Sequence, residues 1–264
     1  MASKTQVFHD LHKSGCFVIP NPWDPGSAIY LQKLGFKALA STSAGFAWSQ
    51  GHPDNKVILE LLLDHLKKIA AAVDIPVSAD FEDGLAVDPN GVARNVLLAI
   101  ETGIAGLSIE DSTREGTEPL YAFDFAVERI RAARAAIDRS GSGVVLTARS
   151  EGFIAGRPDL AQTIKRLQAY AAAGADCLFA PGLSTKDQIQ AVVAAVAPKP
   201  LNLIAGPWIT QKEVANLGVR RISVGGSLAK AAWLGFSKAA TEIAEQGTFN
   251  GLAGPHLDLN ALFK

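Results

Sequence analysis

The sequence predicts an α/β protein with the fold of a (β/α)8 TIM barrel, on three observations. Eight short apolar runs recur along the 264 residues, stretches with helical spacing separate them, and glycines stand just ahead of several runs. Runs that are apolar on both faces are typical of parallel strands covered by helices. The alternative, a doubly wound open sheet, is expected to carry a G-x-G-x-x-G turn after an early strand. No such turn follows the first strands, so the barrel is favoured.

Each predicted strand has the length of a buried strand. In chain order the strands cover residues 16–19, 38–42, 76–80, 106–110, 144–149, 176–180, 201–204 and 221–224. One helical stripe between the second and third strands is formed, at steps of three and four, by Ile58, Leu62, Leu66, Ile69 and Val73. Residues at these steps share one face of a helix.

Four helices are expected to end in a glycine followed closely by a strand. The joints read LGFKAL (34–39), TGIAGL (102–107), AGADCL (173–178) and LGVRRI (217–222). Glycine suits the left-handed backbone position that closes a helix. After residue 246 the pattern becomes irregular, so we expect a catalytic barrel domain over 1–246 and a C-terminal extension of the same domain over 247–264.

Composition excludes several classes of protein. The chain is 48% hydrophobic, and 25 Lys and Arg nearly balance 26 Asp and Glu. This balance argues against a nucleic-acid partner and against disorder. No apolar run is long enough for a membrane span, and the first residues hold no apolar signal core. We therefore expect a cytoplasmic protein without a membrane partner.

Carboxylates gather where two neighbouring predicted strands end. Asp80, Glu82 and Asp83 follow the third strand, and Glu110 and Asp111 follow the fourth. Like charges at the mouth of an apolar barrel repel one another unless a cation is present. Hard oxygen ligands with water suit Mg²⁺, with Mn²⁺ possible. We predict a metal site at Asp80, Glu82 and Glu110; Asp83 or Asp111 could instead cap the following helix.

Two further strand ends suggest substrate contacts. Arg149 ends the fifth strand, where a guanidinium suits a planar carboxylate or phosphate; it could equally pair with Glu151 or Glu110. The turn 42–45, Thr-Ser-Ala-Gly, offers consecutive N–H groups for an anion, or it is an ordinary turn of small residues. His9, His12 and His65 are expected to face solvent.

Together these residues resemble the isocitrate lyase / phosphoenolpyruvate mutase superfamily over residues 8 to 236. The segments that carry the resemblance are SADFEDG (78–84), GLSIEDS (106–112), TARSEGFIAG (147–156), ALASTSAG (38–45) and PLNLIAG (200–206). The resemblance implies a barrel whose last helix is exchanged between subunits, usually in a dimer of dimers. A homo-oligomer, dimer or tetramer, is therefore expected.

The resemblance also implies a site for a small carboxylate substrate. Mg²⁺ is held by the aspartate matching Asp80, partly through waters on Glu82 and Glu110, and chelates a 2-oxo acid or its enolate. Arg149 matches the arginine that binds the substrate or stabilises the enolate oxygen. The remaining matches are Thr42, Ser43 and Ala44 at the substrate carboxylate, Asp54 near the metal waters, and Asn202 in the substrate pocket.

One part of the family pattern is missing. The lyases carry a catalytic cysteine after the fourth strand, but residues 112–148 contain no Cys, His or Lys. The loop reads STREGTEPLY (112–121), so the asparagine that the mutases carry there is also missing, and Glu118 is the residue closest to its position. A retro-aldol cleavage needs a base, for which Asp54 or Glu118 would have to serve.

These observations predict a Mg²⁺-dependent lyase that cleaves a C–C bond of a small 2-oxo or 2-hydroxy carboxylate through a pyruvate-enolate-like intermediate. Decarboxylation of an oxaloacetate-like acid is attractive because it needs no base. The alternatives are a P–C bond enzyme, either a phosphoenolpyruvate mutase or a phosphonopyruvate hydrolase, and a non-catalytic protein that binds a 2-oxo acid.

Overall fold

The computed structural model describes residues 2–113, 118–255 and 258–263. Its eight strands all run parallel and curl into a barrel, in the order β1-β8-β7-β6-β5-β4-β3-β2. The curl closes between β1 and β2, where Ala40 N donates to Pro20 O at 3.1 Å. The predicted (β/α)8 barrel is therefore confirmed.

Every predicted strand is present, shortened by at most three residues. The strands are β1 (Phe17–Val18), β2 (Leu39–Ala40), β3 (Val77–Asp80), β4 (Gly106–Glu110), β5 (Val145–Arg149), β6 (Cys177–Phe179), β7 (Leu201–Ile204) and β8 (Arg221–Ser223). The strands from β3 to β8 are buried along almost all of their length, as expected for parallel strands covered by helices.

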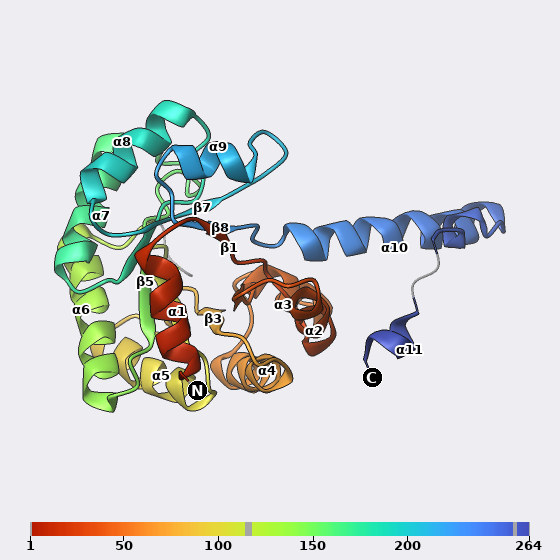
Figure 1. Cartoon of the computed structure of the whole chain (residues 1–264), viewed down its shortest axis with the longest axis horizontal. Coiled ribbons are helices and arrows are strands. Elements are labelled where there is room, and N and C mark those ends of the chain that lie inside the picture. The colour runs from red at the N-terminus through yellow and green to blue at the C-terminus, as the bar shows by residue number, and fades with distance from the viewer. Residues whose placement is uncertain (1, 114–117, 256–257, 264) are drawn as a thin grey trace.

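Helices surround this sheet on its outer side (Figure 1). The helices of the described chain, which include α10 projecting from the barrel, are α1 (Lys4–Lys13), α2 (Pro25–Lys33), α3 (Ser43–Ser49), α4 (Leu59–Ala72), α5 (Pro89–Glu101), α6 (Phe123–Ser140), α7 (Leu160–Ala172), α8 (Lys186–Val196), α9 (Gln211–Asn216), α10 (Ser227–Gln246) and α11 (Leu259–Leu262). A short 3-10 helix, η1 (Asn250–Leu252), follows α10. Within the described residues, none of these helices is long and apolar enough to cross a membrane.

The predicted glycine joints also form. Gly35, Gly103, Gly174 and Gly218 each follow a helix and have φ between +86° and +103°. The first turn of α1 lies near α4, whereas Phe8 of α1 is fully buried against Phe17, Ala105 and Val145, at the amino ends of the strands. This helix closes one end of the barrel, so the opposite, carboxyl end is left for a site.

Three predictions about burial are wrong. His12 was expected to face solvent but is half-buried, with its ring edge-on to Phe8 at a centroid distance of 4.7 Å. Ile58 precedes α4 and is 63% exposed, whereas Leu62, Leu66, Ile69 and Val73 are buried. His65 does not face solvent: it is 4% exposed and stacks on Phe46 with ring centroids 3.6 Å apart. The imidazole lies on the inner side of α4 because Phe46 of α3 offers it a flat apolar partner.

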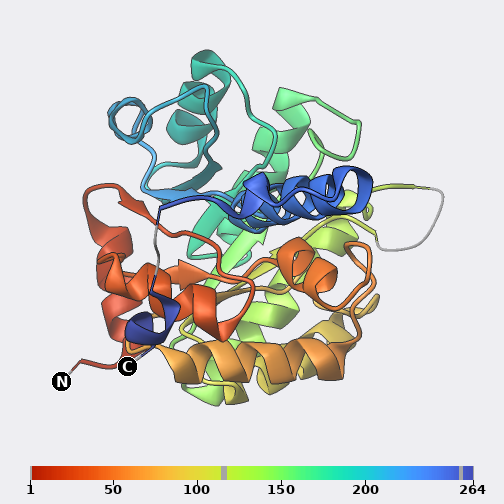
Figure 2. The same cartoon turned by 90° about the vertical axis from the view of Figure 1, so that its right-hand side faces the viewer.

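The last long helix leaves the barrel. α10 projects away from the other helices in Figure 1 and therefore lies in front of the barrel in the turned view of Figure 2. Glu242, near the end of α10, accepts hydrogen bonds from Asn250 N and Gly251 N, both at 2.7 Å. The following η1 therefore folds back on α10. Further along, α11 returns to α2, where Lys33 Nζ donates to Leu262 O. The division of the chain at residue 246 and the exchange of α10 between subunits stay predictions.

Candidate active site

A cavity of about 170 Å³ lies at the carboxyl ends of the strands. This is the end of a β/α barrel at which active sites form. Most of the predicted site residues line it: Thr42, Ser43, Ala44, Asp54, Asp80, Arg149 and Asn202. The fold therefore brings together side chains from β2, β3, β5 and β7 that are far apart in the sequence.

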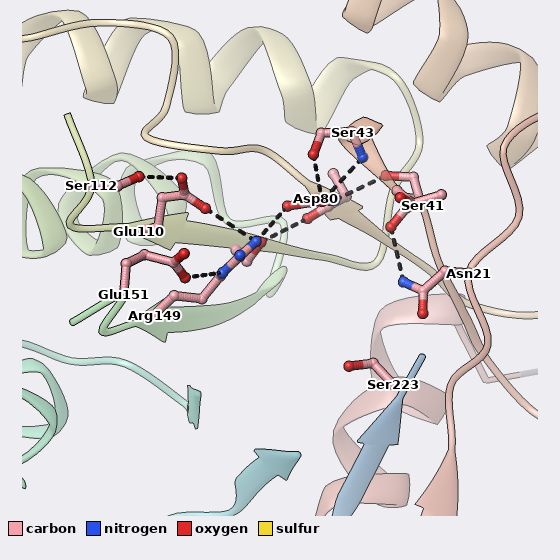
Figure 3. A network of polar contacts seen from close by, with 12 residues as sticks. Asn21, Ser41, Ser43, Asp80, Glu110, Ser112, Arg149, Glu151 and Ser223 are labelled. Atoms are coloured by element: carbon pink, nitrogen blue, oxygen red, sulfur yellow. Dashed lines mark hydrogen bonds and ion pairs between the residues drawn. The ribbon is translucent and has the colours of Figure 1, made fainter. Parts of the chain in front are cut away.

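Arg149 is the centre of the charged network in this site (Figure 3). Its Nη1 lies 2.7 Å from Asp80 Oδ1 and 3.1 Å from Glu110 Oε2, and its Nε lies 2.9 Å from Glu151 Oε1. The three carboxylates come from the ends of β3, β4 and β5. One guanidinium thus contacts acids from three adjacent strands, and its side chain is only 14% exposed.

This network changes the pKa of its members. Burial alone would lower the pKa of Arg149, but Glu110, Glu151 and Asp80 raise it above its usual value. Burial raises the pKa of Glu110 to about 8 against the opposing effect of Arg149, and Glu151 and Asp80 raise it further. Burial likewise raises the pKa of Glu151. The site holds more negative charge than one arginine compensates.

Asp80 is fixed by the turn that follows β2. Its Oδ2 accepts hydrogen bonds from Ser43 N at 3.1 Å and from Ser43 Oγ at 2.9 Å. Ser41 Oγ accepts from Asp80 N at 2.9 Å. The Ala44 N–H, in the first turn of α3, has no hydrogen-bond partner among the residues described. The turn 42–44 therefore orients the acid and leaves one amide towards the cavity that Ala44 lines.

Glu82 lies one step beyond the strand end and is 1% exposed. Its φ is +48°, a left-handed conformation that residues other than glycine rarely adopt. Its carbonyl oxygen accepts from Glu110 N at 2.9 Å, which ties the ends of β3 and β4 together. Glu82 is not part of the cavity lining. Backbone conformations of this kind concentrate at functional sites.

Neither Asp83 nor Asp111 caps the following helix. Asp88 caps α5, and α6 begins without a side-chain cap. Asp83 instead accepts from Tyr121 Oη at 3.1 Å and lies 3.9 Å from Arg129. Asp111 accepts from Glu151 N, Tyr170 Oη and Arg166 Nη1, at 2.7, 2.6 and 3.1 Å. Both acids hold loops in place.

The two predicted bases lie in different surroundings. Asp54 lines the main cavity and a neighbouring one of about 270 Å³, which Glu110, Arg149 and Glu151 also line. Burial, followed by the charge of Asp80, raises the pKa of Asp54. Glu118 is 78% exposed and lies 3.8 Å from Arg157, outside both linings. Residues 114–117 of the predicted loop 112–121 lie outside the described residues.

The donor set suits a hard divalent cation that keeps water ligands. Asp80 and Glu110 already direct oxygens at one shared positive charge, that of Arg149. Over the described ranges, no three His, Cys, Asp or Glu side chains are arranged to hold a metal by themselves. Mg²⁺ is commonly held by one or two carboxylates with water completing the octahedron, so two acids at this position fit it.

Comparison with known proteins agrees with this geometry. A family model described as phosphoenolpyruvate phosphomutase matches residues 8–244. The chain belongs to this family. The phosphoenolpyruvate phosphomutase family and its superfamily comprise barrel enzymes that generally use a divalent metal.

Among solved structures of the family, one from Burkholderia cenocepacia is 46% identical, with a TM-score of 0.94. It covers 98% of this chain and 95% of its own, and its name leaves open whether it is a lyase or a mutase. The structure of an oxaloacetate acetylhydrolase with its product oxalate is 29% identical, with a TM-score of 0.89 and coverages of 99% and 94%. The oxaloacetate decarboxylase of Paraburkholderia xenovorans is 30% identical over 80% of this chain and 71% of its own.

Sequence reasoning left two residues of the site without a role. Glu151 was considered only as a partner of Arg149, yet it is 3% exposed and lines the neighbouring cavity. Arg221 opens β8 and lines the main cavity, although it is only 5% exposed. The available signal for Arg221 was a charged residue at the first position of the predicted strand 221–224.

Proposed function

We propose that this chain is a divalent-metal-dependent lyase that cleaves a C–C bond of a small 2-oxo or 2-hydroxy carboxylate through a pyruvate-enolate-like intermediate. The substrate we favour is an oxaloacetate-type acid, which the enzyme would decarboxylate. The observation that carries this proposal is the position of Arg149, buried between Asp80 and Glu110 and lining the cavity.

Arg149 would supply the positive charge that decarboxylation needs. When the bond between C3 and C4 of oxaloacetate breaks, its electron pair moves towards C2 and the ketone oxygen becomes an enolate oxygen, while CO2 departs. A fixed guanidinium beside that oxygen stabilises the developing charge without reorganising. The three carboxylates around Arg149 hold its plane in place.

The turn after β2 would hold the carboxylate next to the ketone. Thr42, Ser43 and Ala44 line the cavity, and the Ala44 N–H is available to an anion. Asn202 lines the same cavity from β7. We assign it to the substrate pocket because it matches the pocket asparagine of the isocitrate lyase / phosphoenolpyruvate mutase superfamily.

We assign the metal to Asp80, Glu82 and Glu110, with Mg²⁺ as the ion and Mn²⁺ as the alternative. When bound, the ion supplies Lewis-acid stabilisation of the enolate. Asp80 and Glu110 carry this assignment because their oxygens converge, and the left-handed Glu82 joins their two strand ends.

The proton that completes pyruvate must come from a residue or water above the cavity. Of the two acids proposed, Asp54 is better placed because it lines the cavity and its pKa is raised. Glu118 is less well placed, because its carboxylate contacts Arg157 and is 78% exposed. A retro-aldol cleavage would require one of them as base.

A P–C bond enzyme is the second candidate, favoured by the description of the matching family model.

The chain also has the features expected of a homo-oligomer, because Leu234 and Phe236 on the projecting α10 are each 63% exposed. A dimer or tetramer and a cytoplasmic location stay predictions.

The test is turnover of oxaloacetate, followed by loss of its enol absorbance and by pyruvate formation, with Mg²⁺ and then with EDTA. Metal-dependent pyruvate formation supports the proposal. Turnover of phosphonopyruvate but not oxaloacetate would favour the P–C enzyme. Metal-dependent calorimetric binding of oxalate without turnover of any 2-oxo acid would favour a binding protein.

A further inference from the structure

Arg221 is a buried cation without an acidic partner. Its side chain lies inside the barrel and is 5% exposed, yet among the described residues no carboxylate forms an ion pair with it. The other buried cavity arginine, Arg149, contacts three carboxylates. A buried charge is costly unless it is paired, so a group absent from the chain itself is expected to compensate Arg221.

Its neighbours orient the guanidinium but supply no negative charge. Nε donates to Asn202 Oδ1 at 2.8 Å, and Nη1 donates to Thr147 Oγ1 at 3.0 Å. His12 Nε2 lies 3.5 Å from Nη1, and burial followed by the charge of Arg221 lowers the pKa of His12 to about 3, so this ring is neutral. Burial raises the pKa of the Cys177 thiol, which is therefore also neutral.

One nitrogen of the guanidinium, Nη2, remains available to a ligand in the cavity. Nη2 makes no hydrogen bond to any described residue. It is also not one of the fully buried polar atoms that lack a partner, so it remains accessible from the cavity. Ser223 Oγ accepts from Asn202 Nδ2 at 3.0 Å, which leaves its own proton to donate. Both residues line the cavity that Asp80 and Arg149 also line.

The cavity thus has two different ends. Asp80, Arg149 and the turn after β2 lie on one side, whereas Ser223 stands across from them on β8 (Figure 3). Arg149 is close enough to lower the pKa of Arg221 after the larger effect of burial. An anion bound at Arg221 would therefore share one small cavity with a ligand at Asp80.

We propose that Arg221, held by Asn202 and Thr147, binds a second carboxylate of the substrate and so selects dicarboxylic 2-oxo acids over monocarboxylic ones. A guanidinium recognises a carboxylate by geometry as well as charge. In this arrangement Asn202 acts on the substrate through Arg221, as a positioning residue. The inference rests on the proposed lyase function for its substrate class.

The test is calorimetric titration, with Mg²⁺, of two ligands into Arg221→Met and the unchanged chain. Oxalate is short, so its two adjacent carboxylates both lie at the Asp80 end, whereas 3,3-difluorooxaloacetate carries a further carboxylate beyond its ketone and CF2 carbons. Loss of a charged hydrogen bond in a buried site should weaken difluorooxaloacetate binding about 10- to 100-fold. Oxalate affinity should change less than about threefold, which also shows that the variant is folded.

Two further variants sharpen the result. Arg221→Lys keeps the charge and should recover part of the lost affinity, whereas Arg220→Met removes the neighbouring arginine, which bonds Gly15 O outside the cavity, and should change neither ligand. Equal affinity of Arg221→Met and the unchanged chain for difluorooxaloacetate would overturn the proposal, as would equal weakening of both ligands in a folded variant. If the unchanged chain turns over no 2-oxo acid but Arg221 still governs difluorooxaloacetate binding, the lyase proposal fails and this one stands.

Discussion

Arg149 holds three acids of the site together, Asp80, Glu110 and Glu151, and in the proposed reaction it also stabilises the enolate. We expect Arg149→Lys to fold and to lower kcat/KM for oxaloacetate by about 10²- to 10³-fold, since a lysine cannot hold all three acids and face the enolate. Steady-state kinetics with Mg²⁺ checks this. Arg157→Lys, an exposed residue beside Glu118, is the matched control. Full activity of Arg149→Lys would contradict the assigned role.

Asp80 gives the corresponding prediction for the metal. Asp80→Asn keeps the size of the side chain and removes its charge, so we expect Mg²⁺ affinity to fall at least about tenfold. Titration of Mg²⁺ by calorimetry measures it, and Asp74→Asn, on the exposed turn before β3, is the control. Unchanged Mg²⁺ affinity in Asp80→Asn would place the metal elsewhere.

His65 predicts how stability depends on pH. Burial lowers its pKa to about 4, and its buried Nε2 has no hydrogen-bond partner among the residues that the structure describes. The unfolded chain takes up the proton below about pH 6.5 and the folded chain only near pH 4. Stability should therefore fall as the pH decreases from about 6.5 towards 4.

Urea unfolding at pH 7 and pH 5 tests this expectation. The unchanged chain should lose about 1–2 kcal/mol more than His65→Phe between these pH values, because phenylalanine keeps the stack on Phe46 and cannot take up a proton. His52→Phe, in an exposed loop, is the control. An equal loss in all three proteins would show that His65 does not titrate on unfolding.

At the scale of elements, the joint between β2 and α3 decides the shape of the site. A Cβ at Gly45 would lie 2.7 Å from Thr42 Cγ2 and 3.0 Å from Trp23 Cβ, so the turn that holds Asp80 must shift. We expect Gly45→Ala to cost about 1–3 kcal/mol of stability and to lower kcat/KM about tenfold or more. Thermal unfolding and kinetics measure the two effects.

Gly26 in α2 provides the comparison. A Cβ there would meet Asp24 Oδ1 and Phe263 Cζ at 3.5 Å, an ordinary contact. Gly26→Ala should be neutral or stabilise by up to about 1 kcal/mol, with unchanged kinetics. If both variants behave alike, the turn after β2 is more adaptable than its contacts indicate.

For the whole molecule, the projecting α10 favours association of copies of this chain. Trp233, Leu234 and Phe236 leave an apolar surface that a single barrel does not cover, and patches of this kind mark interaction sites. We expect Leu234→Glu combined with Phe236→Glu to reduce the mass in solution towards the 27.7 kDa of one chain. Light scattering after size exclusion measures it, with Lys212→Glu on α9 as a charge control. An unchanged oligomer would place the interface elsewhere.

The strands, the helix ends and the charged residues at the strand ends could all be predicted from local patterns along the chain. Strands apolar on both faces and glycines closing the helices are local signals, so all eight strands and all four glycine joints could be located. Asp80, Glu110 and Arg149 were identified because charged residues directly after apolar strands have one common destination in a barrel, its carboxyl end.

Which groups meet across the barrel depends on contacts between distant segments, which the tertiary structure reveals. His65 was misjudged because the face of α4 that is buried depends on α3, whose Phe46 stacks on the imidazole. Ile58 was misjudged because α4 begins only at Leu59, so Ile58 lies outside the helical stripe. The placement of Glu118 beside Arg157, and of Asp83 and Asp111 in loop networks rather than helix caps, also depends on contacts between distant segments. Arg221 is the clearest case, because its charge is visible in the sequence but its surroundings are not. The closing of the sheet, which sets β8 beside β1 and β7, places that charge in the cavity with no acid from the described segments paired to it.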